Sequence, residues 1–176
     1  MKTIGIIFAM NEELSALKKY LPLQRVNEIY ELIFYESELN NQRIVLVESG
    51  VGKVNAGRTT QILIDNYHPD IIYNIGVAGG IDESLAVGDV VISTSLVQHD
   101  FDITAFNHKK GYIPNVGDTI PVDNSLVINT QRVLEQKNLS YKLGIIASGD
   151  IFCTSKDMAT KINQKFHALC VEMEGA

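Results

Sequence analysis

Two adjacent carboxylates follow the first apolar segment of the sequence. Residues 3–9 form a short apolar run typical of a buried strand, and Glu12 and Glu13 come soon after it, in the first turn of a predicted helix. A carboxylate at such a position can act as a general base that takes a proton from water. The helix dipole also favours acidic residues in a first turn, by about 0.3–1 kcal/mol, and this alone explains the pair without any catalytic role.

A second pair of carboxylates lies near the other end of the sequence. Glu172 and Glu174 flank Met173 directly after the apolar run 169–171. Alternation along a strand sends both carboxylates to the same side, unless the strand ends between them. Charged groups at the tip of a buried strand need partners, and the hydroxyl groups of a sugar would supply them.

Two glycine-rich turns follow predicted strands, but neither matches a familiar phosphate loop. Gly50-Val51-Gly52-Lys53 has no glycine five positions before Gly52, and Val54 replaces the Ser or Thr of a P-loop. A dinucleotide-binding turn is also excluded, because Asn55 stands where its third glycine belongs. This turn and residues 76–80 are explained either by tight strand-to-helix geometry or by a ligand at the carboxyl edge of the sheet.

The histidines do not indicate a metal centre. The segment 99–102, His-Asp-Phe-Asp, has no further ligands at a recognisable spacing. His68 and His167 stand beside a turn and at a helix end, where structural roles suffice. We therefore expect no metal and no cofactor.

The predicted elements alternate in a way that defines the fold class. Strands are expected at residues 3–9, 28–39, 42–49, 71–75, 90–92, 142–148 and 168–173, and helices at 11–21, 53–67, 125–138 and 156–166. Asn11 is the predicted N-cap of the first helix, and Asn40-Asn41 the turn of a hairpin. The pattern predicts an α/β protein with a mixed, mostly parallel sheet, helices on both sides and a single domain over residues 1–176.

Composition narrows the possible partners. The chain has 176 residues and a net charge of −6, and its arginines are scattered, so no basic surface for nucleic acid is expected. No apolar run approaches the length of a membrane span. The two cysteines, Cys153 and Cys170, suggest neither a disulfide framework nor a zinc ribbon, and the cytoplasm is the expected location. A neutral or zwitterionic small molecule is the expected ligand.

Six segments together carry a family resemblance. They are residues 4–13, 49–54, 74–80, 99–106, 148–152 and 171–174. In this order they resemble the 5′-methylthioadenosine/S-adenosylhomocysteine nucleosidases, members of the nucleoside phosphorylase superfamily. The resemblance implies a three-layer nucleoside phosphorylase-like fold. It also implies hydrolysis of the N-glycosidic bond of adenosine thio-nucleosides in methionine salvage, releasing adenine.

The resemblance also implies roles for particular residues at the reacting centre. Glu13 matches the catalytic glutamate of the family and would be the general base for the attacking water. Glu174 would accept hydrogen bonds from the ribose hydroxyls, with Met173 packed beneath the sugar. Gly79 and Ala78 would line the sugar and water site through their backbone groups.

The base and the 5′ substituent would be bound by further residues. By the same resemblance, Phe152 would stack on adenine, and the backbone at Cys153 would contact the edge of the base. The 5′-thio group would lie between Met10 and Val51. Phe106 and Pro114 would close that pocket from a neighbouring subunit, which implies a homodimer.

Two other functions remain open from the residues alone. A purine nucleoside phosphorylase would need cations to hold phosphate, whereas the first loop offers acids and no arginine, and this favours water as the nucleophile. A catalytically dead module that binds adenosine-like ligands is the second alternative.

The sequence departs from the family pattern at three places. Val77 stands where the family usually has serine, and Asn11 where it usually has a third acid. After Ala176 the family continues with the rest of a helix, a strand carrying the aspartate that protonates adenine, and a final helix. We therefore expect a fold that is incomplete at its C-terminus, and weak or no activity for the chain alone, since loss of a general acid costs about 10²–10⁴ in rate.

Overall fold

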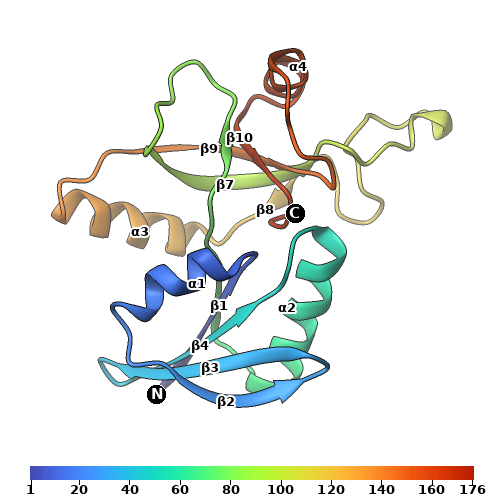
Figure 1. Cartoon of the computed structure of the whole chain (residues 1–176). Helices are drawn as coiled ribbons and strands as arrows, with labels where there is room; N and C mark the ends of the chain where they lie inside the picture. The colour runs from blue at the N-terminus through green and yellow to red at the C-terminus, as the bar shows by residue number, and fades with distance from the viewer. The chain divides into compact units, whose positions relative to one another are not determined.

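The computed structural model describes all 176 residues, which form two compact units, Met1–Val77 and Ala78–Ala176 (Figure 1). Each unit contains a five-stranded sheet of mixed strand direction, accompanied by helices. The predicted α/β class is thereby confirmed. In neither unit is a helix both long and apolar enough to cross a membrane.

In the first unit, the carboxyl ends of three strands lie at one edge of the sheet. Its elements are β1 (Lys2–Phe8), α1 (Asn11–Lys18), β2 (Gln24–Ile29), β3 (Leu32–Leu39), β4 (Gln42–Glu48), α2 (Lys53–Tyr67) and β5 (Ile71–Asn74). The sheet order is β2-β3-β4-β1-β5, with β1 parallel to both β4 and β5 and with antiparallel pairing of β2, β3 and β4. The carboxyl ends of β1, β4 and β5 therefore lie at the same edge, as predicted for the segments that follow them.

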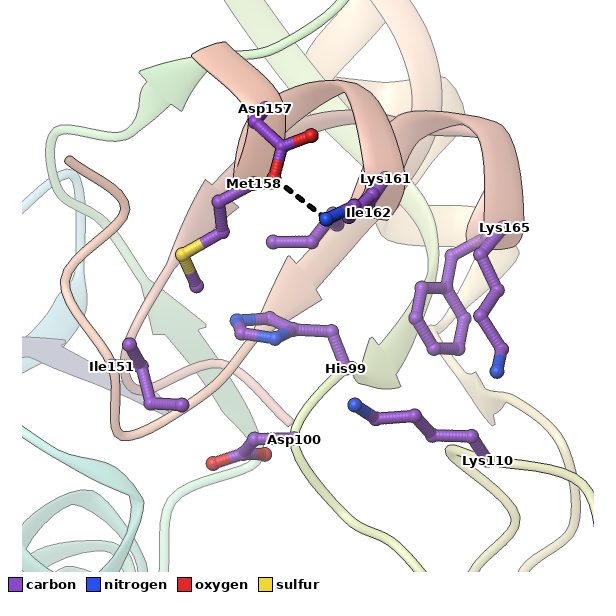
Figure 2. A pocket seen from close by; sticks show the side chains of 10 residues that line it. His99, Asp100, Lys110, Ile151, Asp157, Met158, Lys161, Ile162 and Lys165 are labelled. Atoms are coloured by element: carbon purple, nitrogen blue, oxygen red, sulfur yellow. Dashed lines mark hydrogen bonds and ion pairs between the residues drawn. The ribbon is translucent and has the colours of Figure 1, made fainter. Parts of the chain in front are cut away.

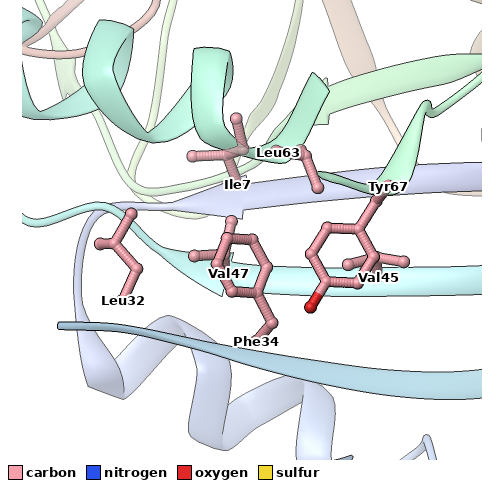
Figure 3. Packing of buried hydrophobic residues seen from close by; sticks show 7 residues of the cluster. All are labelled: Ile7, Leu32, Phe34, Val45, Val47, Leu63 and Tyr67. Carbon is pink, nitrogen blue, oxygen red and sulfur yellow. The ribbon is translucent and has the colours of Figure 1, made fainter. Parts of the chain in front are cut away.

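Both faces of β4, a central strand of the first sheet, are covered by helices. Val45 and Val47 of β4 point to the face that packs against Leu63 of α2, within the cluster drawn in Figure 3. Leu46, between them in sequence, packs instead with Leu14 of α1. All five side chains are almost completely inaccessible to solvent. The near-continuous apolar sequence of β4 follows from this double coverage.

The predicted hairpin turn at Asn40-Asn41 is confirmed, whereas the single strand predicted at 28–39 is divided by a turn at Tyr30-Glu31, and one predicted cap is wrong. Asn40 and Asn41 both have positive φ values, 51° and 60°, as a tight hairpin turn requires. Asn11 was expected to be the N-cap of α1, but the N-cap is Met10, in extended conformation, and Asn11 is the first helical residue. The side chain of Glu13 supplies the capping interaction in its place, by accepting a hydrogen bond from the Met10 N–H.

The second unit has a sheet with a parallel centre. Its elements are β6 (Gly79–Gly80), β7 (Val90–Gln98), a 3₁₀ turn η1 (Thr104–Phe106), β8 (Ile120–Pro121), α3 (Asn124–Gln136), β9 (Tyr141–Ser148), α4 (Lys156–Phe166) and β10 (Ala168–Glu172). The order is β6-β10-β9-β7-β8, with β7, β9 and β10 parallel and the short edge strands antiparallel. Helix α4 packs on β9 and β10 through Ile162, which lies in a cluster with Ala147 and Val171, and α3 packs on β7.

Candidate functional site

The Glu13 carboxylate is fixed by three backbone N–H groups. Its Oε2 accepts hydrogen bonds from the N–H groups of Ala9 and Met10, at 3.0 and 3.1 Å. Its Oε1 accepts one from the N–H of Val77, the last residue of the first unit, at 2.9 Å. Glu12, one position earlier, is exposed, so the two adjacent acids differ in their surroundings.

Gly76 leaves the space that the Glu13 carboxylate occupies. A Cβ atom at position 76 would lie 2.8 Å from Glu13 Oε1, closer than carbon and oxygen atoms approach without a bond. The turn after β5 and the first turn of α1 are therefore in direct contact. The glycine-rich segment 76–80 was predicted as a tight turn or a ligand edge, and its first glycine serves to admit a carboxylate.

The two predicted residues of the 5′ pocket in the first unit lie in the segments that follow two adjacent parallel strands, β1 and β4. Met10 is half-buried at the start of α1, and its backbone N–H holds Glu13. Val51 is 47% exposed in the turn between β4 and α2. The Val51 carbonyl accepts a 2.7 Å hydrogen bond from the Asn55 side chain, which holds the turn in shape.

In the second unit, Gly79 and Cys153 are brought together. They line a common cavity of about 420 Å³, with β6 on one side and the start of α4 on the other. Ala78 and Gly79 have exposed backbones, and Gly79 pairs with Val171 of β10. The cavity also contains Asp82, whose pKa is held below its ordinary value by hydrogen bonds from the Ser84 hydroxyl and backbone N–H.

The loop that carries Phe152 and Cys153 begins with Gly149 and Asp150, which belong to the segment 148–152 of the family resemblance. Gly149 lies against the imidazole of buried His99, because a Cβ at Gly149 would come within 2.3 Å of its Nε2. The next residue, Asp150, donates its backbone N–H to the Asp100 carboxylate at 2.8 Å. Phe152 itself is 75% exposed, so its ring is available to a ligand.

The turn after β10 distinguishes the two carboxylates of the second pair. The strand ends at Glu172, so Glu172 and Glu174 do not alternate along one strand. Both oxygens of Glu172 already have protein donors: the Ser148 hydroxyl on Oε1, and the N–H groups of Glu174 and Gly175 on Oε2. The expectation that sugar hydroxyls would partner the pair therefore applies only to Glu174, whose Oε2 accepts the Met173 N–H at 3.2 Å.

Phe106 and Pro114 lie on a long segment between β7 and β8 that extends away from the sheet (Figure 1). Phe106 is 75% exposed, and Pro114 is exposed as well. The segment is stabilised internally, by a stacked pair of His108 and Tyr112 with ring centroids 4.5 Å apart. Neither predicted residue contacts the cavity that Gly79 and Cys153 line.

A second cavity in this unit contains none of the predicted site residues. It measures about 350 Å³ and is lined by His99, Asp100, Lys110, Ile151, Asp157, Met158, Lys161, Ile162, Lys165 and Phe166 (Figure 2). Lys161 forms an ion pair with Asp157 at 2.6 Å. Lys110 and Lys165 contribute to the lowered pKa of Asp102, after its hydrogen bonds from Thr104. Of the three lysines that line the cavity, Lys161 thus has a carboxylate partner in the same lining.

The comparisons with known proteins decide the family. Residues 3–176 match the profile of the phosphorylase superfamily. Over 172 residues the chain is 42% identical to the 5′-methylthioadenosine/S-adenosylhomocysteine nucleosidase of Staphylococcus epidermidis, which covers 97% of this chain and 75% of that protein. The chain belongs to the 5′-methylthioadenosine/S-adenosylhomocysteine nucleosidases of the phosphorylase superfamily.

Solved structures of the nucleosidase family have the same fold. A Helicobacter pylori nucleosidase mutant with 5′-methylthioadenosine in its active site gives a TM-score of 0.95 at 32% identity, covering 100% of this chain and 77% of that one. The Streptococcus pyogenes S-adenosylhomocysteine nucleosidase in complex with 5-methylthiotubericidin gives 0.92 at 36% identity, covering 99% and 74%. Adenosine-like small molecules are therefore the ligands of these neighbours.

Sequence reasoning missed several residues that hold the nucleosidase motifs in place. Ser148 was noted only as the first residue of a motif, although its buried hydroxyl donates to Glu172. Val77 was noted only for its side chain, although its backbone N–H donates to Glu13. Both contacts join residues far apart in the chain, so no local sequence pattern predicts them.

Proposed function

We propose that this protein hydrolyses the N-glycosidic bond of 5′-methylthioadenosine and S-adenosylhomocysteine. The bond between the anomeric carbon and the adenine nitrogen breaks, and the oxygen of water forms the new bond to that carbon. One proton of the water is taken by a base, and adenine leaves with a proton on its ring. The products are free adenine and the thioribose. Family membership and the geometry of Glu13 support this proposal.

The observation that carries the proposal is the hydrogen bonding of Glu13. An ionised carboxylate offers about four acceptor positions, and the N–H groups of Ala9, Met10 and Val77 fill three of them. One position on Oε1 remains for a water molecule. The carboxylate is thus oriented by groups that cannot take its place as a base, and it can still accept a proton.

The other predicted residues have roles that suit their positions. Glu174 would accept hydrogen bonds from the ribose hydroxyls, with Met173 under the sugar, and Phe152 would stack on adenine. The backbone at Cys153 would contact the edge of the base. Ala78 and Gly79 would contact the sugar through their backbone N–H and carbonyl groups.

The 5′ substituent is assigned to Met10 and Val51. Both offer apolar surface, which suits a thioether better than a charged group. We also propose that residues 1–176 act as one domain. A single cooperative unfolding transition, seen by two independent probes, would be the expected result.

We further propose a homodimer in which Phe106 and Pro114 close the 5′ pocket of the neighbouring subunit. Phe106 is 75% exposed, and an exposed aromatic side chain is suited to burial in a partner's pocket. Light scattering should give the mass of two chains. A monomeric protein that retains full activity would contradict this part of the proposal.

The cytoplasm is the proposed location. Both cysteines, Cys153 and Cys170, are free thiols, as is usual in a reducing compartment. Fractionation of cells followed by detection of the protein would test this directly.

The test of the function is release of adenine from 5′-methylthioadenosine, measured with and without inorganic phosphate. Hydrolysis predicts the same rate in both conditions and the free thioribose as product. A rate that requires phosphate, with a sugar 1-phosphate as product, would identify a phosphorylase instead. Tight binding of the nucleoside with no turnover, even in a version extended by the family's C-terminal segment, would identify a binding module.

A further inference from the structure

We infer that Glu172 is a positioning residue that holds the sugar-binding carboxylate of Glu174 in place, with Ser148 as its support. This inference rests on the proposed function, in which Glu174 binds the ribose hydroxyls. Glu172 itself does not contact the sugar in this scheme. It acts through the turn of residues 173–175, which directly follows β10.

The first observation is the set of hydrogen bonds on Glu172 Oε2. This oxygen accepts the backbone N–H of Glu174 at 2.8 Å and that of Gly175 at 2.7 Å. Two charge-assisted hydrogen bonds to consecutive N–H groups fix the backbone of the turn. The direction in which the Glu174 side chain leaves the chain is set by that backbone.

The second observation is the support of Glu172 from the neighbouring strand. Its Oε1 accepts the hydroxyl proton of Ser148, a residue with no exposed surface at the end of β9. Ser148 and Glu172 are register partners in the parallel pair of β9 and β10. The Glu172 side chain therefore has little freedom to rotate, since both of its oxygens are held.

The third observation is that the proposed base-binding loop begins directly after Ser148, the register partner of Glu172. The Gly149 N–H donates to the Glu172 carbonyl at 3.1 Å, so the strand pairing continues one step past Ser148. The loop that carries Phe152 and the turn that carries Glu174 thus begin at adjacent points of two paired strands. A change at Glu172 alters the sugar contact, while Ser148 keeps the base loop anchored.

The experiment measures kcat and KM for Glu172→Ala, Glu172→Gln and Ser148→Ala. Glu172→Ala should lower kcat/KM about 10- to 100-fold, mainly through kcat, because hydrogen bonds to the sugar strengthen in the transition state and small displacements are costly there. Glu172→Gln should recover most of the loss, since its amide oxygen can accept from the turn while its NH₂ donates to Ser148. Ser148→Ala should fall between them, with exposed Ser140→Ala as the matched control.

A second measurement separates positioning from a general loss of structure. Each variant is assayed with the 2′-deoxy and 3′-deoxy analogues of 5′-methylthioadenosine, beside Glu174→Ala. If Glu172 acts through Glu174, its penalty should shrink for the same analogue that makes Glu174→Ala harmless. The inference would be overturned if the Glu172 variants lost the same activity with every substrate. It would also be overturned if they lost no activity while Glu174→Ala did. If Glu174→Ala itself has no effect on the parent substrate, the proposed sugar site fails instead.

Discussion

The Glu13 carboxylate accepts a 2.9 Å hydrogen bond from the Val77 N–H, and the two residues are 64 positions apart in the chain. The contact joins the first turn of α1 to the glycine turn after β5. It is possible because β1 and β5 are parallel neighbours, so that both segments leave the sheet at the same edge. The position of this carboxylate therefore depends on the turn as much as on its own helix.

Substitution of Glu13 by Gln should abolish most of the activity without weakening substrate binding. The amide cannot take a proton from water, and loss of a general base costs about 10²–10⁴ in rate. The matched control is Glu12→Gln, which changes an exposed carboxylate in the same helical turn and should leave kcat within about twofold. Adenine release and the dissociation constant of a substrate analogue are the measurements. A Glu13→Gln protein with near-normal kcat would refute the assignment of the base.

Substitution of Gly76 by Ala should impair catalysis without removing any catalytic group. The new Cβ would lie 2.8 Å from Glu13 Oε1 and displace it, and a misplaced base costs about 10- to 100-fold in kcat. Gly57→Ala is the matched control, because a Cβ there meets nothing within 4 Å and the residue is exposed inside α2. The control should keep its activity and gain about 0.5–1 kcal/mol of stability. Equal losses of activity in both variants would argue against the steric explanation.

The contrast between α2 and α1 shows what could be predicted from local sequence. The bounds of α2 and α4 were predicted as found, because Gly52 and His68-Pro69 delimit one, and Ser155 and His167 the other. The N-cap of α1 was misassigned because the capping interaction comes from Glu13, a side chain inside the helix. Strand β2 (Gln24–Ile29) was missed for most of its length, since it is largely polar and exposed and lacks the apolar alternation that marks a strand.

The candidate site was predicted unevenly for a related reason. Local patterns indicated acids at both sheet edges but could not distinguish Glu13 from Glu12, or Glu174 from Glu172. The distinction depends on partners contributed by distant segments, such as Val77 and Ser148. The family resemblance selected Glu13 and Glu174, and their proposed roles remain predictions that the variants Glu13→Gln and Glu174→Ala test.

Substitution of Gly149 by Ala should weaken substrate binding more than it slows catalysis. The Cβ would lie 2.3 Å from His99 Nε2, so either the imidazole or the loop carrying Phe152 and Cys153 must move. We expect KM to rise by about tenfold or more, because base stacking contributes about 1–3 kcal/mol and depends on the position of the ring. Phe152→Ala should give a similar rise in KM, and the double variant should be no worse than the poorer single one. Fully additive effects would show that the two changes act independently.

The two cysteines should differ sharply in reactivity towards an alkylating reagent. Burial raises the pKa of the Cys170 thiol to about 11, so at about pH 8 it is protonated as well as inaccessible. Cys153 is partly exposed at the predicted edge of the base site and should be the only residue labelled in the native protein. Mass spectrometry of the digested protein would locate the label. A substrate analogue should slow labelling of Cys153, and labelling that ignores the analogue would place the base elsewhere.

The raised pKa of Cys170 also predicts a loss of stability in alkali. The native fold favours the neutral thiol, because the folded-state pKa of about 11 exceeds the ordinary value of 9.0. This contribution is complete below pH 9, declines as the unfolded chain begins to ionise, and is lost as the pH passes through 11. The melting temperature should therefore fall over this interval, and the fall should be smaller in Cys170→Val, which keeps an apolar side chain of similar size and has no ionisable group. Identical alkaline profiles for the two proteins would show that other groups cause the destabilisation.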